Sequence, residues 1–150
     1  MTSIATRPQR AGSGRAPSPA GAYPEPSPLA GRVGLGISGF VALFLLVDAI
    51  ARIAGFAPYV EGTVEFGYAA EQAPVIGLAL LIPTLLYLLP RTAVLGAILV
   101  TGYLGGAVAS HLRMTDAGFA FAAAFGVLAW LGLYLRDERL RALLPLRTRA

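Results

Sequence analysis

The sequence predicts an all-α fold: a bundle of four transmembrane helices with both termini in the cytoplasm and a disordered N-terminal tail. Hydrophobic residues make up 56% of the 150 residues and charged residues 13%, against about 25% charged in ordinary globular domains. A chain of this length has too little interior to hide so much apolar surface from water. The apolar residues also fall into four long runs, with most basic residues in alternate connecting segments. These observations together predict a membrane protein.

The N-terminal segment 1–31 differs in composition from the rest of the chain. It contains six of the eleven prolines, together with glycine, serine, alanine and arginine. Such a segment cannot bury enough apolar area to offset the entropy lost on ordering. We therefore expect a disordered tail over 1–31 and a membrane domain over 32–136.

The first apolar run extends from Val33 to Phe56 and predicts a spanning helix over about 33–55. The alternative is a cleaved signal peptide, because the "AIA" at 49–51 resembles a small-residue cleavage site. That leader would be about 50 residues long, well beyond the usual length. Asp48 would also end its apolar stretch close to the cut, so the helix is favoured.

Three further runs predict helices over 73–89, 92–111 and 117–135. Their uncharged stretches contain 17, 19 and 19 residues, within the roughly 17–25 that cross a bilayer as a helix. Only Pro90 and Arg91 separate the second helix from the third. These two helices should therefore be antiparallel neighbours, with Thr92 placed to cap the third.

The arginines predict the orientation. All twelve basic residues are arginine, and with the N-terminus inside, only Arg52 and Arg113 lie toward the outer face. The outer loop 57–72 carries three glutamates and no arginine. Since basic residues concentrate in cytoplasmic loops, both termini are expected inside. This placement assigns the positive charge to the membrane surface, so no nucleic-acid partner is expected.

The C-terminal segment 137–150 has Leu140, Leu143 and Leu144 at helical spacing among arginines. This pattern suits a short amphipathic helix that lies on the anionic inner leaflet. The alternative is a frayed continuation of the fourth helix. Both interpretations stay open.

The candidate functional residues are the ionisable ones near the apolar runs. Asp48 comes about 22 Å into a core of roughly 30 Å, with Arg52 one turn later on the same helix face. Ionisable side chains inside spanning segments usually face a partner or a cavity. The pair is therefore either a self-neutralising structural pair or part of a binding site.

The third helix brings further polar groups to the same depth. His111, the only histidine, comes about 28 Å above the start of its helix, and Tyr103 lies on the same face two turns below. Histidine is the side chain that changes charge between about pH 5 and 8. The alternative for His111 and its neighbour Arg113 is ordinary helix-end hydrogen bonding at the interface. We predict one polar pocket in the outer half of the membrane, lined by Asp48, Arg52, Glu65, Tyr103, His111 and Arg113.

Small residues recur at every fourth position of the third helix. Gly102, Gly106 and Ser110 form such a row, and rows of this kind let helix backbones approach closely in lipid. We expect this row to pack against another helix.

The chain's own residues predict neither redox nor metal chemistry. Without cysteine, disulfides, thiol relays and iron–sulfur ligation within this chain are excluded. A single histidine cannot supply two axial ligands to a haem, and the sequence has no HExxH, Walker A or GxSxG motif. We expect no metal site and no catalysis by this chain alone.

Three stretches resemble the DoxX-like family of small bacterial four-helix membrane proteins: "VEGTVEFGYAAEQAPVIGLAL", "PRTAVLGAILVTGYLGGAVASHLR" and "LYLRDERLRALLPLR". The resemblance covers about residues 33–147. Members often carry an acidic residue in the first helix and a basic one four positions later, as Asp48 and Arg52 do here. Ala69 stands where a proline often follows the "GY" of the outer loop.

The resemblance implies a place in the bacterial cytoplasmic membrane and a link to redox metabolism, because the family takes its name from subunits associated with quinone-linked oxidation. The implied role is an accessory or quinone-interacting subunit, with a bound quinone as the implied cofactor. The alternative is a protein that handles a small molecule or lipid, or is purely structural, without a redox role. Expected partners are membrane lipids and either an oxidoreductase subunit or a second copy of the chain.

Overall fold

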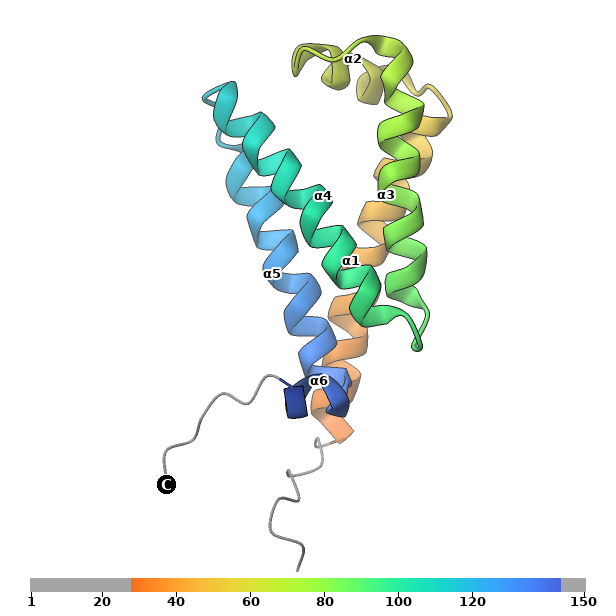
Figure 1. Ribbon diagram of the computed structural model, residues 1–150, viewed down its shortest axis with the longest axis vertical. Coiled ribbons are helices and arrows are strands. Elements are labelled where there is room, and N and C mark those ends of the chain that lie inside the picture. The colour runs from red at the N-terminus through yellow and green to blue at the C-terminus, as the bar shows by residue number, and fades with distance from the viewer. Residues whose placement is uncertain (1–27, 144–150) are drawn as a thin grey trace, which may run out of the picture.

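The computed structural model describes residues 28–143 as an arrangement of helices (Figure 1). In this part of the chain the long helices are α1 (Pro28–Ile53), α3 (Ala73–Leu88), α4 (Ala93–Arg113) and α5 (Gly118–Arg136). The short elements are α2 (Ala57–Glu65), the 3-10 helix η1 (Ala70–Gln72) and α6 (Glu138–Leu143). All four long helices, with η1 continuing into α3, are long and apolar enough to cross a membrane. The predicted all-α fold with four long apolar helices is confirmed.

The long helices form a ring in which each contacts two others. α1 packs against α3 and α5, and α4 packs against the same two helices. Figure 1 shows the α1–α3 and α4–α5 pairs diverging toward the end of the molecule that carries α2. The start of α1 and the short α6 lie together at the opposite end. The divergence leaves room for a cavity beside α2.

Glycines set the close helix crossings. A Cβ on Gly34 of α1 would lie 2.7 Å from Cβ of Leu135 on α5, and one on Gly77 of α3 would lie 2.7 Å from the Ala49 carbonyl oxygen on α1. A Cβ on Gly96 would meet the backbone of Tyr87 at the turn between α3 and α4. At these positions only glycine allows the backbones to approach so closely.

A buried polar junction joins three helices at the α6 end. The Tyr87 hydroxyl on α3 donates to the carbonyl of Ala129 on α5 and is hydrogen-bonded to Oγ of Ser38 on α1, both at 2.9 Å. Arg136 donates to the Tyr87 carbonyl at 3.1 Å and lies over its ring. Tyr87 is fully buried, so these partners satisfy a hydroxyl that would be costly to bury alone.

The outer surface of the ring is apolar. Among its large hydrophobic side chains, Leu43 is 64% exposed, Val75 65% and Val127 67%. Phe40 is 58% exposed and packs beside Phe125 of α5. Such a surface on all sides of the ring is that of a protein solvated by lipid chains.

The N-terminal boundary differs from the expectation. α1 begins at Pro28, so residues 28–31 are helical and do not belong to a disordered tail. Proline is tolerated in the first turn of a helix because its missing N–H has no partner there in any case. The rest of the predicted tail, 1–27, lies outside the described residues.

Two connecting segments also differ from the expectation. The segment 57–72, expected to be an outer loop, contains α2 and η1. Its helix signal is the proline in the first turn of α2 and Gly67 just after it, at φ +83°, a pairing typical of helix ends. Thr92 precedes α4 as expected but does not cap it, because its hydroxyl donates to the Leu86 carbonyl at 2.8 Å instead.

α6 is a separate helix and not a frayed continuation of α5. Asp137 is extended between the two helices, and its carboxylate accepts hydrogen bonds from the backbone N–H groups of Arg139 and Leu140 at 2.9 and 3.3 Å. Leu140 is 3% exposed and belongs to the core. The amphipathic helix therefore packs its leucine against the bundle; Leu144 lies outside the described residues.

Candidate ligand-binding cavity

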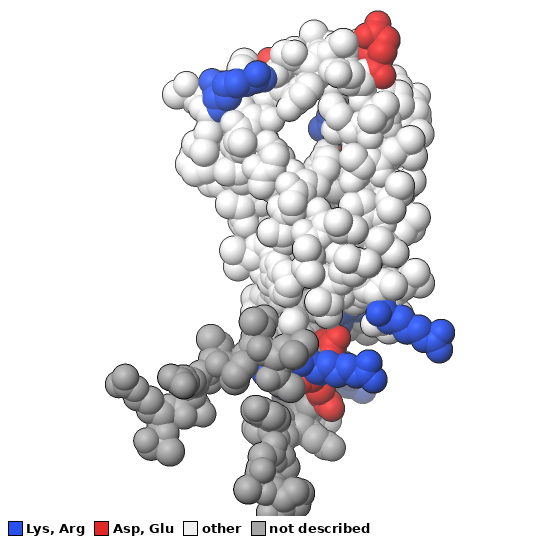
Figure 2. Space-filling model, in the orientation of Figure 1, with Lys and Arg blue, Asp and Glu red and all other residues white. Residues whose placement is uncertain are grey.

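A cavity of about 310 Å³ lies between α3 and α4 at the α2 end of the bundle. Figure 2 shows the molecule hollowed there, with a basic side chain visible inside. The volume is at the lower end of the range for small-ligand pockets. The lining comes from α1, α2, α3, α4 and the segment after α2: Arg52, Thr63, Phe66, Tyr68, Ile76, Ala79, Gly102, Tyr103, Gly106, Ala107, Ser110 and His111.

An ion pair lies at the head of this cavity. Nε of Arg52 donates to Oδ2 of Asp48 at 3.1 Å and to Oδ1 at 3.3 Å, and Nη2 donates to Oδ1 at 3.3 Å. Both side chains are 19% exposed. Asp48 does not itself line the cavity; it lies behind Arg52 and balances its charge. The i, i+4 spacing places the two groups on one face of α1, as expected.

The same guanidinium connects α1 to α2. Nη1 of Arg52 donates to Oγ1 of Thr63 at 2.6 Å and to the Tyr59 carbonyl at 3.5 Å. The Thr63 hydroxyl in turn donates to the Tyr59 carbonyl at 2.8 Å. Thr63 is 1% exposed, and the Arg52 guanidinium carbon lies 5.8 Å from the Tyr59 ring centre. These contacts hold α2 as a cover over the head of the cavity.

Tyr103 faces the ion pair across the cavity. It is half-buried and close enough to Asp48 and Arg52 to interact with both electrostatically. Among the described residues its hydroxyl has no hydrogen-bond partner. The hydroxyl is therefore available to a ligand.

The small-residue row of α4 forms a wall of the cavity and does not pack against another helix among the described residues. Gly102, Gly106 and Ser110 all line the cavity. A Cβ on either glycine would meet nothing within 4 Å. The glycines that do pack are those at the helix crossings described above. This face of α4 is uncovered because α4 diverges from α3 here.

The segment after α2 is docked onto the end of α4. Nη2 of Arg113 donates to the Phe66 carbonyl, and the Tyr68 hydroxyl is hydrogen-bonded to Oγ of Ser110 at 3.3 Å. The Phe66 ring meets the His111 ring edge-on, with centres 4.6 Å apart. Arg113 therefore fastens the cover of the cavity without lining the cavity itself.

His111 lines the cavity and also closes the turn between α4 and α5. Its Nδ1 lies 2.6 Å from Oδ2 of Asp116. The hydrogen bond with His111, together with one from the Gly118 backbone, holds the pKa of Asp116 below its ordinary value. The helix-end interpretation of His111 is thus correct for one side of its ring, while the residue also belongs to the cavity.

Of the six predicted pocket residues, the structure brings Arg52, Tyr103 and His111 together in one lining. Asp48 and Arg113 support that lining from behind and from the rim. Glu65, the last residue of α2, is exposed and does not line the cavity. The reason is that α2 turns Thr63, and not Glu65, toward Arg52.

Sequence reasoning missed the residues of the cover and the partner of His111. Thr63, Phe66 and Tyr68 lie in a segment taken for a loop, so no helix face could be assigned to them. Asp116 could have been found, because a carboxylate in the short turn after His111 is within reach of its ring.

The arrangement suits a ligand with a polar head that accepts hydrogen bonds. A guanidinium can donate five hydrogen bonds, and the Asp48, Thr63 and Tyr59 contacts of Arg52 use four of them. One N–H on Nη2 and the Tyr103 hydroxyl therefore remain as donors. Because Asp48 already neutralises Arg52, the site favours an uncharged acceptor over an anion.

Membrane-spanning helices that surround a cavity with a partly buried ion pair at one end define a multi-pass membrane protein with a candidate ligand site. Comparison with family models identifies it further: the model of the DoxX-like family matches residues 36–132, well over half of the chain. The protein belongs to the DoxX-like family, as the resemblance implied. Comparisons with curated proteins and with solved structures gave no match.

Proposed function

We propose that this protein holds the ring of a membrane quinone in the cavity beside α2, as an accessory subunit of a membrane oxidoreductase. The observation that carries the proposal is the Arg52 guanidinium, neutralised by Asp48 and exposed to a cavity with both polar and apolar lining residues. A quinone carbonyl accepts hydrogen bonds and carries no charge, which matches the two remaining donors. The isoprenoid tail would leave the cavity sideways into the lipid.

The proposed role is accessory because the chain has no group that carries electrons. It has no cysteine and a single histidine, so a partner subunit would have to reduce or oxidise the bound quinone. The chain's own residues would bind and orient the ring. Arg52 and Tyr103 would polarise a carbonyl by donating hydrogen bonds to it.

The proposal includes an orientation in the bacterial cytoplasmic membrane. Basic side chains gather at the α6 end of the molecule (Figure 2), which supports a cytoplasmic location of both termini. The cavity would then open in the outer half of the bilayer. Alkaline phosphatase fused after residue 150 should be inactive, and the same enzyme inserted in the segment 57–72 should be active. The reverse pattern would overturn the orientation.

Quinone binding is tested with the purified full-length chain. The Tyr103→Phe variant removes one donor from the cavity and should weaken binding of decylubiquinone about three- to tenfold, the effect of one hydrogen bond. Tyr134→Phe is the matched control, because Tyr134 lines a different surface groove. Equal affinities of both variants and the wild type would overturn the assigned site.

Material extracted from the protein separates the two functional classes. Mass spectrometry of the organic extract after mild purification from native membranes should find a quinone, and an oxidoreductase subunit should co-purify. A reproducible phospholipid or other small molecule in place of quinone, with no redox partner, would favour the alternative of a lipid- or metabolite-handling protein.

A further inference from the structure

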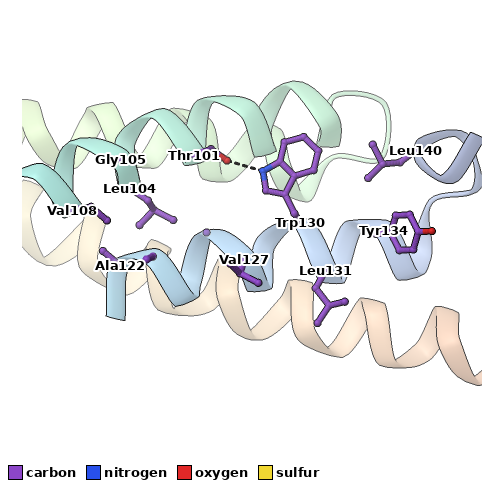
Figure 3. A pocket seen from close by; sticks show the side chains of 12 residues that line it. Thr101, Leu104, Gly105, Val108, Ala122, Val127, Trp130, Leu131, Tyr134 and Leu140 are labelled. Atoms are coloured by element: carbon purple, nitrogen blue, oxygen red, sulfur yellow. Dashed lines mark hydrogen bonds between the residues drawn. The ribbon is translucent and has the colours of Figure 1, made fainter. Parts of the chain in front are cut away.

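A second and larger cavity lies on the outside of the bundle. It is an apolar groove of about 660 Å³ between α4 and α5, with the α6 residue Leu140 at one end. Figure 3 shows its lining side chains along the two helices, with Trp130 near the middle. The indole N–H of Trp130 donates to Oγ1 of Thr101 at 2.8 Å, so these two polar groups near the middle of the groove satisfy each other. Nothing in the quinone site uses this surface.

Small side chains create the groove. Gly105 of α4 and Ala122, Ala123 and Gly126 of α5 line it. A Cβ on Gly105 would meet nothing within 4 Å, and one on Gly126 would only touch Leu104 at 3.9 Å. The two helices contact each other, yet they leave a channel along their outer side. Its depth comes from missing side chains and not from a gap between helices.

The groove faces the bilayer. Val127 and Leu131, on its wall, are 67% and 42% exposed, and the four-helix ring lies behind them. Water gains little along Gly105, Ala122 and Gly126, because no polar side chain is available there. A flexible hydrocarbon chain from the surrounding membrane is the occupant that fits this shape and chemistry.

The charges at the end of the groove specify the head group. Leu140 closes the groove there, and Arg139 and Arg141 flank it in the sequence. Arg141 donates to the carbonyls of Tyr134 and Leu135 at the end of α5. The Arg141 guanidinium carbon also lies 5.8 Å from the ring centre of Tyr134, which lines the groove, and Arg141 has no ion-pair partner among residues 28–143. A positive group at the mouth of an apolar groove complements an anionic head attached to a hydrocarbon chain.

We propose that the groove between α4 and α5 is a binding site for an anionic phospholipid, with one acyl chain along Gly105 and Gly126 and the phosphate beside Arg141. A second copy of the chain is the competing occupant. It fits less well, because two parallel copies meeting along this groove would bring their α6 arginines together, and like charges at close range repel.

The test uses the full-length protein and native mass spectrometry. Gly105→Leu with Gly126→Leu fills the groove without meeting backbone atoms. Gly39→Leu on α1 is the matched control, because a Cβ there also meets nothing within 4 Å and Gly39 does not line the groove. The probes are dioleoyl phosphatidylglycerol and dioleoyl phosphatidylcholine, which share acyl chains and differ in charge.

We expect phosphatidylglycerol to remain bound to the wild type and to Gly39→Leu. The affinity of the groove variant for phosphatidylglycerol should be at least about tenfold lower. Arg141→Gln should lower the affinity for phosphatidylglycerol about fivefold, or roughly 1 kcal/mol, and leave phosphatidylcholine unchanged. Equal retention by the groove variant and its control overturns the site. A dimer that the groove variant abolishes identifies a second copy as the occupant instead. Both results are independent of quinone binding.

Discussion

Nη1 of Arg52 on α1 lies 2.6 Å from Oγ1 of Thr63 on α2, while the rest of the same guanidinium is paired with Asp48. One arginine therefore balances a charge inside α1 and fixes the cover of the cavity. The i, i+4 spacing alone describes only the first of these roles. The contact with Thr63 makes the ion pair part of the tertiary structure, which gives it measurable consequences.

The Asp48→Asn variant should lower the free energy of unfolding by roughly 2–3 kcal/mol. Removing one partner of a fully buried pair costs about 3–5 kcal/mol in soluble proteins, and the exposure of one fifth on both side chains reduces the effect. The double variant Asp48→Asn with Arg52→Gln should recover most of the loss, since it leaves no unpaired charge. Unfolding by sodium dodecyl sulfate in mixed micelles measures both.

Glu61→Gln is the control for this prediction, because Glu61 is exposed on α2 and its change should be neutral within about 0.5 kcal/mol. A double variant no more stable than the single one would mean that Asp48 and Arg52 act separately. If the double variant is stable but no longer binds quinone, the pair serves the ligand as well as the fold.

Thr63→Val should loosen α2 without unfolding the bundle. It removes the acceptor for Arg52 and leaves part of a buried guanidinium without a partner, a change worth about 1.5–3 kcal/mol for a bond to a charged group. Hydrogen exchange should accelerate in α2 and stay slow in α4. Thr84→Val is the matched control, because Thr84 bonds only its own helix at Leu80. Unchanged exchange in α2 would show that the Thr63 contact does not hold the cover.

Acid should remove the contribution of the turn between α4 and α5. The hydrogen bond with His111 lowers the pKa of Asp116, so its carboxylate stabilises the folded state at pH values above the ordinary aspartate pKa of about 3.9. That contribution is lost as the pH falls through the lowered pKa. Asp116→Asn should therefore reduce the melting temperature at pH 7, and the difference from the wild type should shrink below about pH 4. A difference that stays constant to pH 3 would contradict the assigned contact.

The parts of the fold that could be predicted from the sequence are those decided by solvent. Each apolar run must become a helix in lipid, because every backbone polar group has to be satisfied internally. The ends of helices α3, α4 and α5 accordingly lie within about two residues of the predicted ends. The leucine spacing in 137–150 allows either a short helix or a frayed end of α5, and the segment that forms α2 was expected to be a loop. In both segments the outcome depends on packing of Leu140 and Thr63 against the bundle, which the sequence pattern does not determine.

The candidate site was predictable as far as depth along a helix determines it. Counting residues places Arg52 and His111 at one level and Tyr103 two turns below His111 on the same face, and all three line the cavity. Which way a helix face turns depends on its neighbours, and depth along the helix does not determine it. Gly102 and Gly106 were assigned to helix packing although α4 diverges from α3 beside them, and Glu65 was placed over a cavity that α2 covers with Thr63.

Alanine substitutions test which glycines of α4 are packed against other parts of the protein. Gly96→Ala should destabilise the protein by about 1–3 kcal/mol. The new methyl group would meet the Tyr87 backbone, which cannot move aside as a side chain could. Gly102→Ala and Gly106→Ala should be neutral or stabilising by up to about 1 kcal/mol, because alanine loses less conformational entropy than glycine in a helix. The added methyl groups would have no atom within 4 Å to clash with. Unfolding free energies of the three variants in one detergent make the comparison. Destabilisation by Gly102→Ala or Gly106→Ala comparable to that of Gly96→Ala would mean that this face of α4 is packed in the membrane, either by a second copy of the chain or by closure of the cavity.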